Sequence, residues 1–188
     1  PVPQMGLWKR KIQEPATKGT VQVLRGCSMG DIFPRVHQAT ERLLQRLGYK
    51  VQWLDGCCGA LHAHQGLGPG AEKRLAKLLR KQKDLPLLTN SAGCGAHLKD
   101  HGVKVEDISE FLLRNGLVDL LRASEGVAKT VTYHDACHLA HGQKVRSQPR
   151  DLIRAIPGIQ YLELPHADHC CGSAGVYNVL QPVIAAEL

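Results

Sequence analysis

The sequence predicts an α/β fold built from two tandem repeats, each with a short parallel sheet flanked by helices. Two observations support this class. Short β-like runs alternate with helical stretches, which is the pattern of parallel βαβ units, and the same order of elements occurs twice in 188 residues. Aromatic residues make up only 4% of the chain against 43% hydrophobic residues overall, so we expect an aliphatic core, as is usual where helices cover a sheet.

The first repeat is predicted from a β-like run, a helix and a second β-like run. The run at 21–24 ends just before Cys27. Apolar residues at helical spacing follow and predict a helix that Gly48 ends; they are Val36, Ala39, Leu43, Leu44 and Leu47. The second run, at 51–54, leads directly to the turn Cys57-Cys58-Gly59.

The second repeat shows the same signals in the same order. Val131 and Tyr133 lie in a β-like run before Cys137, and apolar residues at helical spacing follow before Gly158. A further run at 159–164 precedes the turn Cys170-Cys171-Gly172. The first cysteine and the paired cysteines are 30 positions apart in one repeat and 33 in the other, which indicates an internal duplication.

The segment between the repeats completes the expected organisation. We expect a helix at 71–83, a strand at 86–89 that ends near Cys94, and a helix at 108–114. The predicted boundaries are a tail at 1–19, a first cysteine-rich repeat at 20–125 and a second, truncated one at 126–188. The chain begins at Pro1 and stops within an apolar helix-like stretch, so we expect it to be a piece of a longer protein.

Seven cysteines are the strongest chemical signal in the sequence. Seven is odd, so full disulfide pairing is excluded, and the spacing is not that of a small secreted scaffold. Two adjacent thiolates at a turn can both bind metal, and the following glycine lets the backbone approach a bulky cluster. The alternative is that they are small buried apolar residues. The predicted metal-binding cysteines all follow predicted strands, and open parallel sheets bind their ligands at the carboxyl ends of the strands. These cysteines are Cys27, Cys57, Cys58, Cys94, Cys137, Cys170 and Cys171.

The number of thiols differs between the predicted sites. Four in the first repeat suffice for a four-iron, four-sulfur (4Fe-4S) cluster or for tetrahedral zinc. The second repeat contributes three, so that site is expected to be incomplete. Several histidines lie near these motifs and are expected beside the metal or on the surface rather than as ligands; they are His62, His64, His134, His138, His141, His166 and His169. Asp135 is expected to cap the following helix, with orientation of His134 as the alternative.

Charge and hydropathy exclude some partners. The formal net charge is +7, with cations concentrated in the run 73–83. We interpret that run as a solvated helix face, with an acidic partner subunit or anionic lipid headgroups as the alternative. The basic stretches lack interleaved aromatic residues, so no nucleic-acid partner is expected. No apolar window is long enough to cross a bilayer, and a cytoplasmic location is predicted.

Four longer motifs identify a resemblance. They are Gly56-Cys57-Cys58-Gly59-Ala60-Leu61-His62-Ala63-His64, Asn90-Ser91-Ala92-Gly93-Cys94-Gly95, Tyr133-His134-Asp135-Ala136-Cys137-His138-Leu139-Ala140-His141-Gly142-Gln143 and Cys170-Cys171-Gly172-Ser173-Ala174-Gly175. They resemble the cysteine-rich CCG domain family, whose members include heterodisulfide reductase subunits, lactate-utilisation proteins and the iron–sulfur subunit of glycolate oxidase. From about Leu24 onward the chain looks like the carboxy-terminal part of the last.

The resemblance implies two Rossmann-like CCG repeats and an iron–sulfur subunit that is not catalytic alone. It would take electrons from FAD-containing glycolate oxidase subunits and pass them toward membrane quinone, either in the cytoplasm or peripherally at the inner face of the cell membrane. One departure bears on the alternatives. Heterodisulfide-reductase relatives carry a thiol where this chain has Ser91, which argues against a catalytic disulfide reductase. A lactate-utilisation subunit and a structural zinc module remain open.

Overall fold

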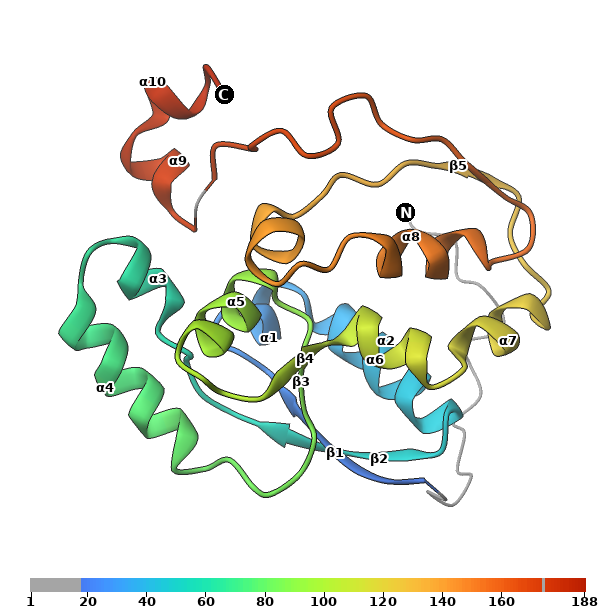
Figure 1. The fold of residues 1–188 in the computed structure, drawn as a ribbon, viewed down its shortest axis with the longest axis horizontal. Helices are drawn as coiled ribbons and strands as arrows, with labels where there is room; N and C mark the ends of the chain where they lie inside the picture. Colours follow the sequence, from blue (N-terminus) through green and yellow to red (C-terminus); the bar gives the residue numbers. More distant parts are fainter. Residues whose placement is uncertain (1–17, 174) are drawn as a thin grey trace.

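The computed structural model describes residues 18–173 and 175–188, and it has an α/β architecture with short parallel sheets (Figure 1). The first sheet has the strand order β2-β1-β3-β4 and is parallel throughout. Its strands are β1 (Gly19–Leu24), β2 (Tyr49–Leu54), β3 (Leu87–Thr89) and β4 (Val105–Asp107). The second sheet pairs β5 (Lys129–Val131) with β6 (Ile159–Tyr161), also in parallel. The predicted fold class is confirmed.

Helices connect these strands and cover the first sheet on both faces. They are α1 (Met29–Ile32), α2 (Pro34–Arg46), α3 (Ala60–His64), α4 (Gly68–Leu79), α5 (Ala92–Asp100), α6 (Ile108–Arg114), α7 (Leu117–Arg122), the π-helix η2 (His138–Gly142), α8 (Ser147–Arg154), α9 (Tyr177–Leu180) and α10 (Pro182–Ala185). Among the residues that the structure describes, no helix is long and apolar enough to span a membrane.

The register of the two sheets confirms the duplication. Val21 in β1 pairs with Val51 in β2, and Val131 in β5 pairs with Tyr161 in β6. The paired residues are 30 positions apart in both sheets, and each residue of the first pair lies 110 positions before its counterpart. Cys27 and Cys137 are separated by the same 110 positions. The two halves therefore place their first cysteine at the same point relative to the strands.

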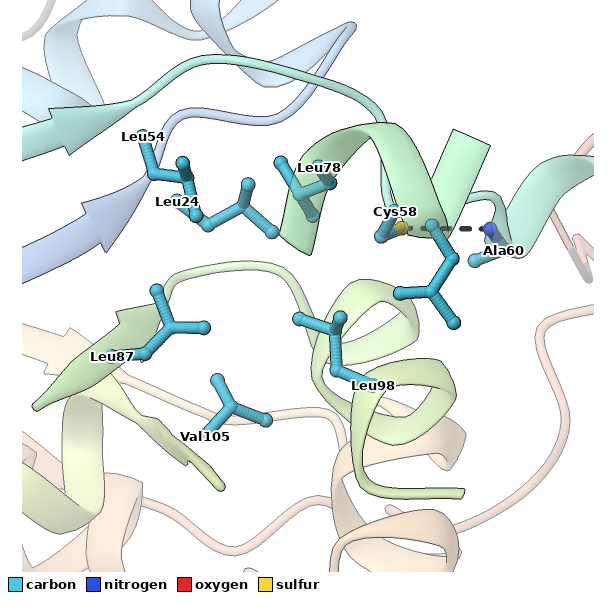
Figure 2. Close-up of a cluster of buried hydrophobic side chains, with 9 residues drawn as sticks. Leu24, Leu54, Cys58, Ala60, Leu78, Leu87, Leu98 and Val105 are labelled. Carbon is cyan, nitrogen blue, oxygen red and sulfur yellow. Dashed lines mark hydrogen bonds between the residues drawn. The ribbon is translucent and has the colours of Figure 1, made fainter. Parts of the chain in front are cut away.

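Two aliphatic clusters fill the two faces of the first sheet. One joins Leu24, Leu54 and Leu87 of the strands to side chains of α4 and α5 (Figure 2). The other joins Val21, Val23 and Leu88 to α2, α6 and α7. Alternate residues of β1 thus point to opposite faces, as the period of a strand requires. Burial of these side chains fixes the strand ends that carry the cysteines.

The buried face of α2 differs from the predicted one by one residue. Val36 is 41% exposed, whereas His37, Thr40 and Leu44 are buried. The sheet-facing row runs through positions three and four apart, and a buried polar pair, His37 and Thr40, occupies the first two turns of α2. The prediction included Val36 because it counted only hydrophobic residues at helical spacing, and a histidine is not counted in such a pattern.

Helix contacts join the second repeat to the first. Helix α5 packs against η2, and both α6 and α7 pack against α8. The segment with α6 and α7 leads from the first sheet to β5 across the molecule (Figure 1). The two cysteine-bearing edges are therefore brought together by α5, which carries Cys94.

Candidate metal centre

Four cysteines lie at the carboxyl edge of the first sheet. Cys27 follows β1, Cys57 and Cys58 follow β2, and Cys94 lies in the first turn of α5 after β3. Strands β1 and β3 are neighbours at the position where the chain changes its direction of progress across the sheet. Crevices at such a position are where open parallel sheets bind ligands. The topology thus directs thiols from three strands to one edge.

Cys58 and Cys94 form the tightest pair. Their sulfurs are 3.1 Å apart, with the Cys58 thiol donating to Cys94, and Cys58 is only 3% exposed. The hydrogen bond to Cys94, together with burial, raises the pKa of Cys58. The same bond, supported by one from Ser91, lowers the pKa of Cys94 to about 7. The pair therefore holds one proton and one thiolate near neutral pH, and the proton belongs to the pair rather than to one sulfur.

Cys27 and Cys57 form the second pair. The pKa of Cys57 is raised chiefly by burial, with further contributions from the charge and hydrogen bond of Cys27. Two groups oppose this shift, the Gly59 N–H and the positive charge of Arg74. Cys57 and Cys58 are adjacent in sequence, and the charge of Cys57 contributes to the raised pKa of Cys58, so the two pairs are neighbours along the edge.

The Cys-Cys-Gly turns are fixed by close backbone packing. Gly59 has φ +96°, and a Cβ there would lie 2.5 Å from the carbonyl oxygen of Ala71 in α4. Gly172 has φ +69°, and its Cβ would lie 2.5 Å from the carbonyl oxygen of Ala185 in α10. Both conditions favour glycine. The two repeats therefore build the same turn against the same kind of following helix.

Backbone N–H groups point at sulfur in both turns. Ala60 N lies 3.5 Å from Cys58 Sγ, shown as the dashed line in Figure 2, and Gly172 N lies 3.4 Å from Cys170 Sγ. Hydrogen bonds of this kind favour the thiolate form and tune the potential of iron–sulfur clusters. The turns thus provide both ligands and donors to those ligands.

The four thiols fit a cluster in their chemistry and location. They are soft ligands at one sheet edge, and one is already a thiolate near neutral pH. A hollow of about 370 Å³ opens beside Cys27 and Cys57. Within residues 18–173 and 175–188, no three or more Cys, His, Asp or Glu side chains stand together as a metal site. The structure brings the thiols together as two pairs, and a single four-thiolate site stays a prediction.

The three cysteines of the second repeat are more open. Cys137 is half-buried, and Cys170 and Cys171 are exposed. All seven cysteines are free thiols. Within the described ranges, no hydrogen bond links any two of these three sulfurs. Their convergence on a second site therefore also stays a prediction.

Asp135 does not cap a helix, contrary to expectation. Its two carboxylate oxygens accept hydrogen bonds of 2.7 and 3.0 Å from the guanidinium of Arg150 in α8. Arg150 also bonds to Glu163. The bond from Arg150 is the main reason that the pKa of Asp135 lies below its usual range. This bidentate ion pair instead ties the segment before Cys137 to α8.

Sequence reasoning missed a buried polar link between the cysteine loops. Asn90 Nδ2 donates to His37 Nδ1 at 3.2 Å and to Thr40 Oγ1 at 3.0 Å. His37 Nε2 lies 2.9 Å from the carbonyl oxygen of Arg25, which requires the Nε2-protonated neutral ring. His37 thereby connects the loop before Cys27 to the loop before Cys94. Its spacing from Thr40 and Leu44 on one helix face was the available signal.

Histidines also meet where the two repeats touch. The rings of His64 and His138 stack at 4.8 Å with an interplanar angle of 3°. Burial, followed by the charge of His138, lowers the pKa of His64. These two rings come from α3 and η2, one from each repeat. Two histidines expected near the cysteine motifs are therefore contacts between repeats.

Comparison with known proteins identifies a cysteine-rich domain family and relatives that are iron–sulfur subunits. The family model "CCG: Cysteine-rich domain" matches residues 21–99 and 131–188. A probable glycolate oxidase iron-sulfur subunit of Bacillus subtilis is 33% identical over 91% of this chain and 43% of its own length. The glycolate oxidase iron-sulfur subunit of Escherichia coli is 31% identical over 91% of this chain and 47% of its length.

A third relative belongs to a different kind of enzyme complex. It belongs to the fumarate reductase (CoM/CoB) of Methanothermobacter marburgensis and is 34% identical over 94% of this chain and 37% of its own length. The chain thus spans less than half of the length of each of these three relatives.

Proposed function

Because this chain belongs to the cysteine-rich CCG domain family, we propose that it is the electron-transfer part of the iron–sulfur subunit of a glycolate oxidase complex. Electrons would come from an FAD-containing subunit and leave toward membrane quinone. The observation that carries the proposal is the row of four thiols at one sheet edge, in which the Cys58 and Cys94 sulfurs lie 3.1 Å apart. The two glycolate oxidase relatives support the choice of complex.

The cysteines divide between two sites in this proposal. Cys27, Cys57, Cys58 and Cys94 would hold a 4Fe-4S cluster, which accepts and releases one electron when bound. Cys137, Cys170 and Cys171 would supply three ligands of a second site. The chain's own contribution is to orient thiolates, donate N–H groups to sulfur and exclude water from Cys58. The proposed location is cytoplasmic or peripheral at the inner face of the cell membrane.

Two alternatives are separated by specific residues. A disulfide-reducing role is disfavoured because Ser91 supplies a hydroxyl that donates to Cys94 instead of a further thiol. A structural zinc module is favoured by nothing beyond the four thiolates, which suit zinc equally well. Iron, sulfide and zinc analysis of anaerobically purified protein distinguishes these sites.

The test is Cys58→Ser in the full-length subunit within its complex. A hydroxyl is a poor ligand for iron that favours thiolate, so iron content should fall and quinone reduction should drop by more than about 100-fold. Glycolate oxidation with an artificial flavin-level acceptor should persist, since the flavin lies on another chain.

The matched control is His62→Ala, which alters the same motif without removing a thiol. It should lower quinone reduction by about 10- to 100-fold at most. Unchanged quinone reduction in the Cys58 variant would refute electron transfer through the first repeat and favour structural zinc.

A further inference from the structure

The surface of α4 and the turn after it carries an unneutralised positive charge. Residues 71–84 contain six cations and two acidic side chains. All six cations are exposed, and none forms an ion pair with another described residue; they are Lys73, Arg74, Lys77, Arg80, Lys81 and Lys83. Ion pairs elsewhere in the described chain use Arg25, Lys99, Arg114, Arg150 and Arg154. The cations of 73–83 are thus available to an external partner.

Some of these cations lie beside the thiols of the first repeat. The hollow of about 370 Å³ has Cys27 and Cys57 on its lining together with Arg74, Lys77 and Lys81. Arg74 is close enough to act on the Cys57 thiol electrostatically. Lys81 Nζ reaches over to the Asp55 carbonyl oxygen at 3.2 Å. Three cations therefore lie around the hollow that opens onto Cys27 and Cys57.

An exposed apolar pair follows Cys27, which lines the same hollow. Ile32 and Phe33, which follow Cys27 through the short helix α1, are 65% and 52% exposed. The connection to the hollow runs through Arg25, whose side chain lies against Gly30 in α1 and pairs with Asp55 at 3.2 Å. Asp55 lines the hollow. Apolar contact area flanked by charge is the composition of a protein interface.

We propose that the hollow, the cations of 73–83 and the pair Ile32 and Phe33 form the docking surface for an acidic face of the electron-donating flavin subunit. The inference rests on the proposed function, because it assigns the partner of that same site. Docking at this surface would let one electron pass from the reduced flavin to the cluster, while the flavin proton passes to solvent. Complementary charge speeds such encounters by about 10- to 1000-fold.

The shape of the surface favours a protein over a lipid bilayer. Arg74, Lys77 and Lys81 share a hollow with Cys27 and Cys57, which a protruding part of a protein can enter and a flat array of headgroups cannot. Electron transfer also requires that the donor approach the thiol edge. Binding to anionic lipid is therefore an outcome that the test must exclude.

The test uses the full-length subunit, anaerobically loaded, and its separately purified flavin subunit. The variant Lys77→Glu/Arg80→Glu reverses two exposed charges of α4 and its C-cap. Arg74 is left unchanged because its charge acts on Cys57. The control Lys104→Glu/Lys129→Glu reverses two exposed charges at the amino ends of β4 and β5, at the opposite ends of the strands from the cysteines. Stopped-flow absorbance records reduction of the cluster by the flavin subunit at several salt concentrations.

The wild-type second-order rate should fall as salt rises, since screening acts over about 8–10 Å. At low salt the α4 variant should be slower by about 10-fold or more, and the control should change less than about 2-fold. Reduction by dithionite should be equal in all three proteins. Salt-independent wild-type reduction, or equal slowing in both variants, overturns the docking surface while leaving electron transfer in place.

Two further outcomes complete the test. No reduction of the wild-type cluster by the flavin subunit at any salt concentration overturns the proposed function and the docking surface together. Sedimentation with vesicles that contain anionic phosphatidylserine, lost in the α4 variant, combined with an unchanged flavin-to-cluster rate, assigns the charge to membrane binding and overturns the protein partner.

Discussion

Replacing Gly59 by alanine tests the backbone packing that sets the first Cys-Cys-Gly turn. Two costs add at this residue. Its φ of +96° strains any L side chain by about 1–2 kcal/mol, partly offset by about 0.4–1 kcal/mol from the stiffer unfolded chain. The new Cβ would also lie 2.5 Å from the Ala71 carbonyl oxygen, which forces α4 away and adds about 1–3 kcal/mol. We expect a total loss of about 2–4 kcal/mol.

Gly66→Ala is the matched control, because Gly66 has φ +74° and no atom within 4 Å of the added Cβ. It should cost only about 1 kcal/mol or less, so the difference between the variants isolates the contact with α4. The measurement is the urea unfolding midpoint of both variants, metal-free and anaerobic, under identical conditions. Metal content after reconstitution should also fall only in the Gly59 variant. Equal midpoints would show that Ala71 yields freely and would refute the proposed rigidity of the turn.

Two other predictions concern ionisation and charge. In metal-free protein, one thiolate should appear with a midpoint near pH 7, because Cys58 and Ser91 donate to Cys94. Ultraviolet thiolate absorbance recorded against pH should show this midpoint. The Ser91→Ala variant should move it upward, and an unmoved midpoint would argue against the Ser91 bond. Asp135→Asn should destabilise the protein by about 1–3 kcal/mol at pH 7, because charged hydrogen bonds to Arg150 are lost. Since the folded pKa of Asp135 is depressed, its stabilisation is present above the unfolded pKa of about 4 and disappears as pH falls through the lower folded value. Urea midpoints of wild type and variant should therefore converge at low pH, and a constant difference would contradict the ion pair as its source.

Local pattern was sufficient to predict much of the fold. β-like runs ending in cysteine predicted β1 and β2, and the repeated order of signals predicted that β5 and β6 would pair in the same way. The intervals of 30 and 33 positions between the cysteines indicated the duplication, and the strand pairs 21–51 and 131–161 are both 30 positions apart in the structure. Gly48 and Gly158 marked the same helix end in each repeat.

Partners distant in sequence could not be predicted in this way. The role of Asp135 depends on Arg150, which the fold of α8 brings back to it, whereas capping was inferred from neighbours in sequence. The division of four thiols into the pairs Cys58–Cys94 and Cys27–Cys57 arises from contacts between loops that follow three different strands and are distant in sequence. His37 was missed because its burial is compensated by Asn90 and by the Arg25 carbonyl group, neither of which is visible from the pattern of α2.

Helix α5 links the chemistry of the first site to the assembly of the two repeats. Cys94 lies in its first turn, and the next residue, Gly95, lies against the side chain of Gln143 from the second repeat, where a Cβ would come within 2.7 Å of Gln143 Cδ. Gln143 Nε2 also donates to the Ala92 carbonyl oxygen at 3.0 Å, in the same turn. A proposed ligand is therefore the immediate neighbour of the contact between repeats. The position of this single helical turn therefore sets both the place of the Cys94 thiol and the contact between the repeats.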